Sequence, residues 1–175
     1  METEDLIELG KEAGEVGDRV IGVTMAITAA FLATVTLMGH RLHTEEVVLQ
    51  TKSADGWAYY QAKNNRSHMY TTDSKLAALI GTPAAAPLVV EWSKKGTEER
   101  QQAEEIRVEN EKLDHETEAT ARRATYFDLA EICLEIGIVL SSISLLTKAA
   151  LFWRLGFIPV AIGLVIAGIG LVGRF

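Results

Sequence analysis

The stretch Val20–Gly39, VIGVTMAITAAFLATVTLMG, runs without a charged side chain for about 20 residues, the length that an α-helix needs to cross the hydrocarbon layer of a bilayer. Arg19 and Arg41 bracket it, and both can extend their charged ends toward the interfaces. The residues before it are acidic, whereas a signal peptide begins with basic residues. The sequence therefore predicts a retained transmembrane helix over residues 19–39.

Two further apolar stretches lie near the C-terminal end of the sequence. We predict a second span at residues 132–153, because Trp153 and the arginine after it are the residue types that bilayer interfaces select. A third span is predicted at residues 157–173, with Gly156 and Pro159 making the turn before it.

Small residues recur along one face of the predicted third span. Gly163, Ala167 and Gly170 are spaced by four and three positions, which brings them onto the same side of a helix. Small residues at this spacing let another helix approach closely in a membrane. We therefore expect this face to be a helix-packing surface.

The insert between the first and second spans, residues 40–131, is long and strongly charged. A break at residues 81–87 divides it into two arms of nearly equal length, because Gly81 can cap a helix and the prolines after it cannot continue one. The predicted fold class is an all-α membrane protein with three transmembrane helices. A long antiparallel, coiled-coil-like helical hairpin is expected between the first and second spans.

The second arm has a seven-residue rhythm that is typical of a coiled-coil seam. The two series are Ile106, Leu113, Thr120, Phe127 and Leu134, and Ala103, Asn110, Thr117, Ala124 and Glu131. Asn110 at such a position can fix the register or the oligomeric state. Because the phase continues into the second span, we expect one helix to run from the insert into the membrane without a hinge.

The first arm contains the most distinctive stretch of the chain, Ser53–Tyr70, SADGWAYYQAKNNRSHMY. Its small and amide side chains at four-three spacing are predicted to pack against the second arm; they are Ala54, Ala58, Gln61, Asn65 and His68. Trp57, Tyr59 and Tyr60 flank that line, and rigid aromatics with polar ends are typical of interfaces. We predict that they contact a neighbouring subunit or partner; the alternative is that they only pack the two arms together.

Composition narrows the classes of function. A net charge of −7 argues against nucleic-acid binding, which needs a basic face. The single Cys133 lies in an apolar run, excludes an intrachain disulfide and is interpreted as a small apolar residue. The sequence lacks the common nucleotide-binding, zinc-protease and serine-hydrolase motifs, so we predict a non-enzymatic protein without a cofactor. Residues 1–18 are predicted to form an acidic tail with a short amphipathic helix.

Two groups of titratable residues are expected near one membrane boundary. His40 and His43 end the first span, and Asp128, Glu131 and Glu135 begin the second. Histidines with carboxylates can ligate a divalent metal, which makes His40, His43 and Asp128 weak candidates for metal ligands. The alternative is that Arg41 pairs with one of the carboxylates and that the two histidines lie in the lipid headgroup layer. Glu131 and Glu135 are the candidate ion or proton site, since ionisable residues within spans are commonly functional.

The run Trp57-Ala58-Tyr59-Tyr60-Gln61-Ala62-Lys63, within Asp55–Tyr70, resembles the signature of a bacterial membrane family known as domain of unknown function 4337. The resemblance extends over nearly the whole chain, from Asp18-Arg19-Val20 to the closing spans with Lys148 and Trp153-Arg154. It implies a three-span layout and assigns no activity, so no catalytic residue is carried over. The tip sequence Gly81–Pro87 is not a feature of this family, which leaves contacts at the tip undefined.

Three hypotheses of function follow. The first is a structural protein of the membrane that forms homo-oligomers through its hairpin and its small-residue span, alone or with other membrane-protein partners. The second is an oligomeric channel or an ion-coupled membrane protein that uses Glu135, and the third is a metal-binding protein at the membrane interface. The expected location is the bacterial inner membrane. The basic residues are divided almost evenly: Arg41, Lys52, Arg122, Arg123 and Arg174 favour a cytoplasmic hairpin, whereas Lys11, Arg19, Lys148 and Arg154 oppose it. The short acidic N-terminal tail is easy to translocate, so we expect a cytoplasmic hairpin.

Overall fold

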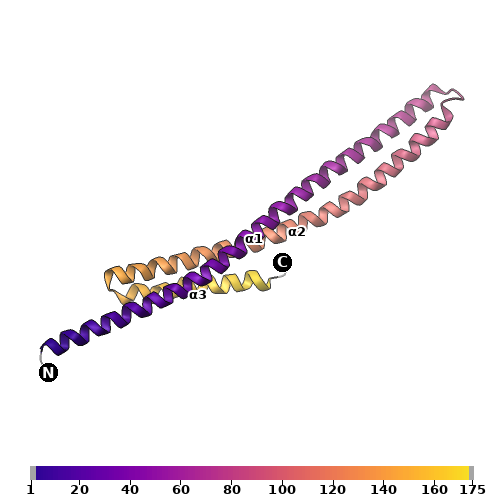
Figure 1. The fold of residues 1–175 in the computed structure, drawn as a ribbon. Coiled ribbons are helices and arrows are strands. Elements are labelled where there is room, and N and C mark those ends of the chain that lie inside the picture. The colour runs from indigo at the N-terminus through magenta and orange to yellow at the C-terminus, as the bar shows by residue number, and fades with distance from the viewer. Residues whose placement is uncertain (1–2, 174–175) are drawn as a thin grey trace. The chain divides into compact units, whose positions relative to one another are not determined.

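The computed structural model describes residues 3–173, and the side chains of residues 17–173. Three α-helices form this part of the chain: α1 (Thr3–Ile80), α2 (Ala86–Thr147) and α3 (Ala150–Val172) (Figure 1). Residues 3–173 contain no β-strand, so the predicted all-α class is confirmed. The amphipathic face predicted for the N-terminal tail and the predicted role of Arg174 lie outside the described side chains.

Each of the three helices contains a segment that is long and apolar enough to cross a membrane. The mean hydropathy of these segments is 2.1 in α1, 2.0 in α2 and 2.5 in α3, and each contains at most two charged residues. Their length and composition are those of a multi-pass membrane protein, as predicted.

The connection between α1 and α2 follows from its glycine and prolines. Gly81 has a φ of +66°, a left-handed conformation that glycine adopts without a steric penalty, and its N–H donates to the carbonyl of Ala77 at 3.4 Å. Pro83 cannot continue a helix, whereas Pro87 lies in the first turn of α2, where its missing N–H is not needed. The break at 81–87 is therefore confirmed, although α2 already begins at Ala86.

The turn between α2 and α3 lies earlier than predicted. α2 ends at Thr147, and Lys148 takes a φ of +57° before α3 begins at Ala150. The Oγ1 of Thr147 accepts a hydrogen bond from the N–H of Ala149 at 3.4 Å, and the Oγ of Ser144 donates to the Ala149 carbonyl at 2.9 Å. The prediction that the second span reaches residue 153 is wrong, because local hydroxyl bonds make a turn without glycine or proline.

Gly156 and Pro159, predicted to form that turn, lie inside α3 instead. Membrane helices tolerate proline because neighbouring groups can satisfy the freed carbonyl. Gly156 serves close packing: a Cβ added there would lie 3.1 Å from the carbonyl oxygen of Gly137 on α2. The glycine is therefore a contact residue of α3, not a helix breaker.

The chain forms two compact units. Residues 1–44 and 120–175 form the first, which we call the apolar unit, and residues 45–119 form the second, which we call the charged unit. Both long helices pass from one unit into the other without interruption, as predicted for α2.

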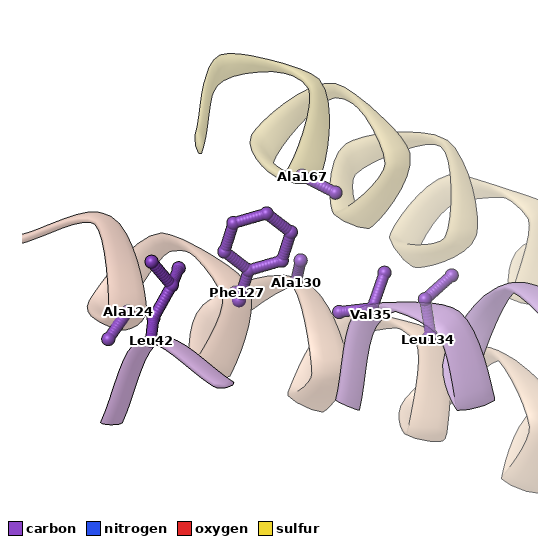
Figure 2. Packing of buried hydrophobic residues seen from close by; sticks show 7 residues of the cluster. All are labelled: Val35, Leu42, Ala124, Phe127, Ala130, Leu134 and Ala167. Atoms are coloured by element: carbon purple, nitrogen blue, oxygen red, sulfur yellow. The ribbon is translucent and has the colours of Figure 1, made fainter. Parts of the chain in front are cut away.

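The core of the apolar unit is a cluster of side chains from all three helices (Figure 2). Phe127 of α2 is 1% exposed, and its ring projects toward Ala167 of α3. Val35 and Leu42 of α1 pack into the same cluster. This core combines one large ring with small residues, which lets the three helices approach closely.

In the charged unit, hydrogen bonds join α1 to α2 at two levels. The Nδ2 of Asn110 donates to the Ser53 carbonyl at 3.2 Å, whereas nearer the turn the Oγ of Ser74 donates to the Val89 carbonyl at 3.0 Å. The α2 side of this contact was predicted correctly: its seven-residue series is buried or half-buried throughout. It includes Ala103 and Asn110, each 2% exposed.

The α1 side of the contact was predicted one residue out of phase. All five predicted packing residues are exposed: Ala54, Ala58, Gln61, Asn65 and His68. The residues that face α2 instead are Ser53, Lys63, Ser67, Ser74 and Ala77. The prediction favoured alanines over serines, but in this unit the serine hydroxyls reach backbone carbonyls across the contact, which makes their burial inexpensive.

Candidate functional site

Two hydrogen bonds between polar side chains join α1 and α2 at one end of the apolar unit. The Oγ1 of Thr36 donates to the Oε1 of Glu131 at 2.8 Å. The Nε2 of His43 lies 3.1 Å from both carboxylate oxygens of Asp128. These bonds place Glu131 level with Thr36 and bring the predicted histidine and carboxylate groups together.

Glu135 lies one helical turn beyond Glu131 on the same side of α2, and it is exposed. At about 1.5 Å of rise per residue, Glu135 is roughly 6 Å further along α2 than the Thr36–Glu131 bond. Arg41 lies roughly 7 Å from that bond in the opposite direction, by the same rise. The carboxylate of Glu135 is thus about 13 Å from the Arg41 level, inside the apolar part of the unit.

The opposite end of the apolar unit is also defined by polar contacts. The Nζ of Lys148 forms an ion pair with Asp18. The Nε1 of Trp153 donates to the Oγ1 of Thr24 at 3.0 Å. Arg19 and Arg41 are separated by about 33 Å along α1, which matches the roughly 30 Å hydrocarbon layer of a bilayer.

Small residues form a line along α1 that leads to Thr36, the residue that is hydrogen-bonded to Glu131. Gly22 and Ala29 precede Thr36 by steps of seven residues, which places the three on one line along the helix. Gly22, Ala26, Ala29 and Ala33 are all exposed. A Cβ at Gly22 would meet no heavy atom of the described residues within 4 Å.

We define the outer face as this strip of α1 together with the acidic strip of α2. Its α1 residues are Gly22, Ala26, Ala29, Ala33 and Thr36, and its α2 residues are Asp128, Glu131 and Glu135. The Thr36–Glu131 bond joins the two strips. The outer face combines two features that hydrocarbon does not favour on a helix surface: an exposed carboxylate and backbone left uncovered by small side chains.

The small-residue face predicted on α3 is occupied within the chain. Gly163, Ala167 and Gly170 are buried. A Cβ at Gly163 would lie 2.9 Å from the carbonyl oxygen of Ala130, and one at Gly170 would lie 3.1 Å from the Cβ of Tyr126. These small residues therefore pack closely against α2 of the same chain.

The candidate metal ligands do not gather into a metal site. His43 and Asp128 are paired, whereas His40 is exposed. Among the residues that the structure describes, no group of three or more histidine, cysteine, aspartate or glutamate side chains could hold a metal ion. The hypothesis of an interfacial metal centre therefore gains no support from the geometry.

The aromatic residues of the distinctive stretch lie in the charged unit. The Nε1 of Trp57 donates to a carboxylate oxygen of Asp114 at 3.1 Å, and Ser53 donates to the other oxygen. The ring of Tyr60 packs edge-on against Trp57, with centroids 5.6 Å apart. Trp57 therefore connects α1 to α2, and both rings are half-buried, so each remains partly accessible to solvent.

Three other predicted interaction residues, Tyr59, Gln61 and Asn65, are exposed. Asn110 is buried and lies opposite Gly56, where a Cβ would be 2.0 Å from its Oδ1. Gly56 was not identified from the sequence as a contact residue. The signal that could have found it is the seven-residue series Gly56, Lys63, Tyr70 and Ala77, which is in phase with the buried serines.

A buried ion pair lies next to these aromatics. The Nζ of Lys63 is 3.1 Å from the Oε2 of Glu99 and 2.6 Å from the Oε1 of Gln102, which accepts a hydrogen bond from it. The Oε2 of Glu99 has no hydrogen-bond donor among the described residues, so its contact with Lys63 is ionic rather than a well-aligned hydrogen bond. The amine also lies 5.7 Å from the ring centroid of Tyr59.

On the solvent side of α2 in the charged unit, charges pair along the helix. A hydrogen bond from Arg107 lowers the pKa of Glu104 below its usual range. Hydrogen bonds and the negative charge of Glu91 raise the pKa of Lys95. Both pairs are exposed, so they stabilise the helix locally and form no site.

The chain matches a protein-family model over residues 17–173, and it belongs to that family, a domain of unknown function (DUF4337). The match covers both units, so the family resemblance suggested by the Trp57–Lys63 run is confirmed. Comparisons with curated proteins and with solved structures give no match.

Proposed function

We propose that this protein is a structural integral membrane protein that self-associates through the outer face. Its role would be to organise a membrane patch or a larger membrane complex. The observation that carries the proposal is the exposed carboxylate of Glu135, one turn beyond the Thr36–Glu131 bond, together with the exposed small residues that continue the Thr36 line of α1.

Glu135 lies where a charged side chain is energetically unfavourable. On membrane-insertion scales a charged side chain at the centre of a span is unfavourable by about 2.5–3.5 kcal/mol. Glutamate has too short a side chain to reach a boundary about 13 Å away, whereas longer basic side chains can do so. Polar groups from another helix would remove this penalty if they covered the carboxylate.

The α1 surface that continues the Thr36 line is shaped for close contact with another helix. Gly22, Ala26, Ala29 and Ala33 leave the α1 backbone open along about three turns, which is the pattern that transmembrane helices use for close contact. The equivalent face of α3 is already taken by α2. A second copy is the occupant that we favour, because a two-fold axis along this strip brings small residue against small residue.

Oligomeric state tests the proposal. Light scattering of the protein in mild detergent should give a mass above that of one chain. The double variant Ala29→Leu/Ala33→Leu should shift the protein to monomer, because added side chains separate the helices. The matched control is Ala161→Leu, an exposed alanine of α3 outside the outer face. A monomeric wild type, or an oligomer unaffected by the outer-face change, would refute self-association through this surface.

A second candidate function is ion or proton coupling through Glu131 and Glu135. The observation that favours it is the hydroxyl bond between Thr36 and Glu131 with Glu135 one turn beyond, which places several exchangeable polar groups inside the apolar unit. This function predicts an ion flux in proteoliposomes that Glu135→Gln abolishes. A flux that survives the substitution, or none in the wild type, rejects it.

We further propose that the charged unit is an antiparallel helical hairpin outside the bilayer, on the cytoplasmic side of the bacterial inner membrane. The contacts between opposite segments of α1 and α2 and the charged composition of residues 45–119 support this placement. A cysteine introduced at Thr82 in a Cys133→Ser background tests it. Impermeant thiol reagents should label it only after the cells are opened; labelling of intact cells would reverse the orientation.

A further inference from the structure

The turn between α1 and α2 carries the most exposed apolar surface of the charged unit. Leu79 is 83% exposed, Ile80 68% and Val90 69%. Leu76 and Leu88 are also exposed. An apolar surface of this kind is unfavourable in water and marks a contact with another molecule or a membrane.

The sequence on both sides of this turn contains no charged residue. From Leu76 to Val90 no residue carries a charge, whereas the rest of residues 45–119 is strongly charged. Leu79 and Ile80 end α1, and Leu88 and Val90 lie in the first turns of α2, so exposed apolar residues occur on both sides of the turn. We call residues 76–90 the apolar tip.

Aromatic and basic residues lie directly behind the apolar tip. Trp92 follows it by two positions, and Lys75, Lys94 and Lys95 flank it. Lys95 forms an ion pair with Glu91, whereas Lys94 has 77% of its side chain accessible and only a long contact with Glu98, at 3.8 Å. Lys75 is exposed as well. Apolar residues backed by tryptophan and lysine are the arrangement that bilayer interfaces select, since the lysines can pair with lipid phosphates.

We propose that the apolar tip inserts shallowly into a lipid surface that carries anionic headgroups. The tip is made of aliphatic side chains, whereas strong protein–protein contacts concentrate on tryptophan, tyrosine and arginine. Two of its backbone N–H groups are already satisfied, from Gly81 to Ala77 at 3.4 Å and from Ala85 to Thr82 at 3.0 Å, which lowers the cost of leaving water. A lipid surface therefore fits the tip better than a protein partner does.

Contact with lipid is measured with a fluorescent probe on the full chain. A cysteine at Thr82 in a Cys133→Ser background is labelled with an environment-sensitive dye, and the protein is reconstituted into vesicles of phosphatidylcholine and phosphatidylglycerol that contain a nitroxide lipid. Because all bilayers in the sample carry the quencher, the tip is detected whichever bilayer it enters. The matched control is the same dye at Gln61, an exposed residue in mid-arm.

The tip probe should be quenched strongly and the Gln61 probe weakly. Leu79→Asp/Ile80→Asp should reduce tip quenching about tenfold, because aspartate disfavours insertion where leucine and isoleucine favour it. Lys75→Gln/Lys94→Gln should reduce it in phosphatidylglycerol vesicles but not in pure phosphatidylcholine. Equal quenching at Thr82 and Gln61 overturns the proposal, as does efficient disulfide pairing of Thr82→Cys between copies, which would assign the tip to a second chain.

Discussion

Replacing Gly56 by alanine should destabilise the charged unit, although the same change in a solvent-facing helix stabilises. An added Cβ would lie 2.0 Å from the Oδ1 and 2.6 Å from the Cγ of Asn110. Asn110 is only 2% exposed, and its Nδ2 donates to the Ser53 carbonyl at 3.2 Å. The amide cannot stay in place, and the surrounding helices leave it little room to move.

Opposing free-energy terms decide whether Gly56→Ala stabilises or destabilises the charged unit. Alanine in place of glycine favours a helix by about 1 kcal/mol. Displacing a buried amide from its hydrogen bond is unfavourable by about 1–3 kcal/mol, and forcing an extra methyl group into a packed site by about 1–3 kcal/mol. The net expectation for Gly56→Ala is a loss of about 2 kcal/mol from the charged unit.

Hydrogen exchange followed by mass spectrometry is the suitable assay, because it reports opening of residues 45–119 separately from the rest of the chain. Gly56→Ala should speed exchange in peptides from both arms near the contact. Asn110→Ala introduced into the Gly56→Ala protein should restore much of the protection, since it removes the clash, with a coupling of about 1–2 kcal/mol. Slower exchange in Gly56→Ala, or simple additivity of the two changes, would refute the reasoning.

Three further predictions follow from contacts in the two units. Gly137→Ala should lower the thermal midpoint in detergent, because its Cβ would lie 2.3 Å from a methyl carbon of α3, whereas Gly168→Ala, with no described atom within 4 Å, should not. Lys63→Met should cost the charged unit about 1–3 kcal/mol by hydrogen exchange, since it leaves the half-buried Glu99 with only Arg66, whose Nη1 lies 3.7 Å away. Lys63→Met/Glu99→Met should recover most of this loss, and equal losses in both variants would contradict the ion pair. Because the pKa of Glu104 is lowered in the folded protein, its contribution to stability is present at neutral pH and is lost as the pH falls through the folded-state pKa. Glu104→Gln should therefore weaken the dependence of the melting temperature on pH below about pH 4. A melting temperature that falls with acid as steeply in the variant as in the wild type would contradict the pairing.

Much of the fold could be predicted because its signals are long and uniform. A charge-free run such as Val20–Gly39 has few alternatives to a membrane-spanning helix. The seven-residue series around Phe127 identified the buried face of α2, since large and small apolar residues alternate there with charges. The turn at Gly81 was predictable for the same reason: glycine and proline restrict the backbone directly.

The errors occur where tertiary contacts decide the outcome. The buried face of α1 contains serines, which a hydrophobic pattern assigns to the surface, and their hydroxyl bonds to the other helix cannot be seen in one sequence. Lys148 adopts a left-handed backbone conformation, which its local sequence does not predict. Pro159 suggested a break, but it lies within α3, where packing against α2 holds the helix.

The candidate site was predicted in part. His43 and Asp128 were expected near the same membrane boundary, and the His43 Nε2 lies 3.1 Å from the Asp128 carboxylate. Glu135, named with Glu131 as a candidate ion or proton site, is exposed. The exposed strip of Gly22 and Ala29 was not identified, because small residues in a span are ambiguous until the structure shows which of them are already covered.

Cysteine cross-linking in native membranes tests the central claim most directly. Ala29→Cys in a Cys133→Ser background places one thiol on the outer face, and Ala161→Cys places one on α3 as the matched control. Self-association through the outer face predicts a disulfide-linked dimer after mild oxidation for Ala29→Cys and none for Ala161→Cys, because only closely approaching helices can bring two cysteines within bonding distance. No dimer at Ala29, or equal dimer at both positions, would contradict the account.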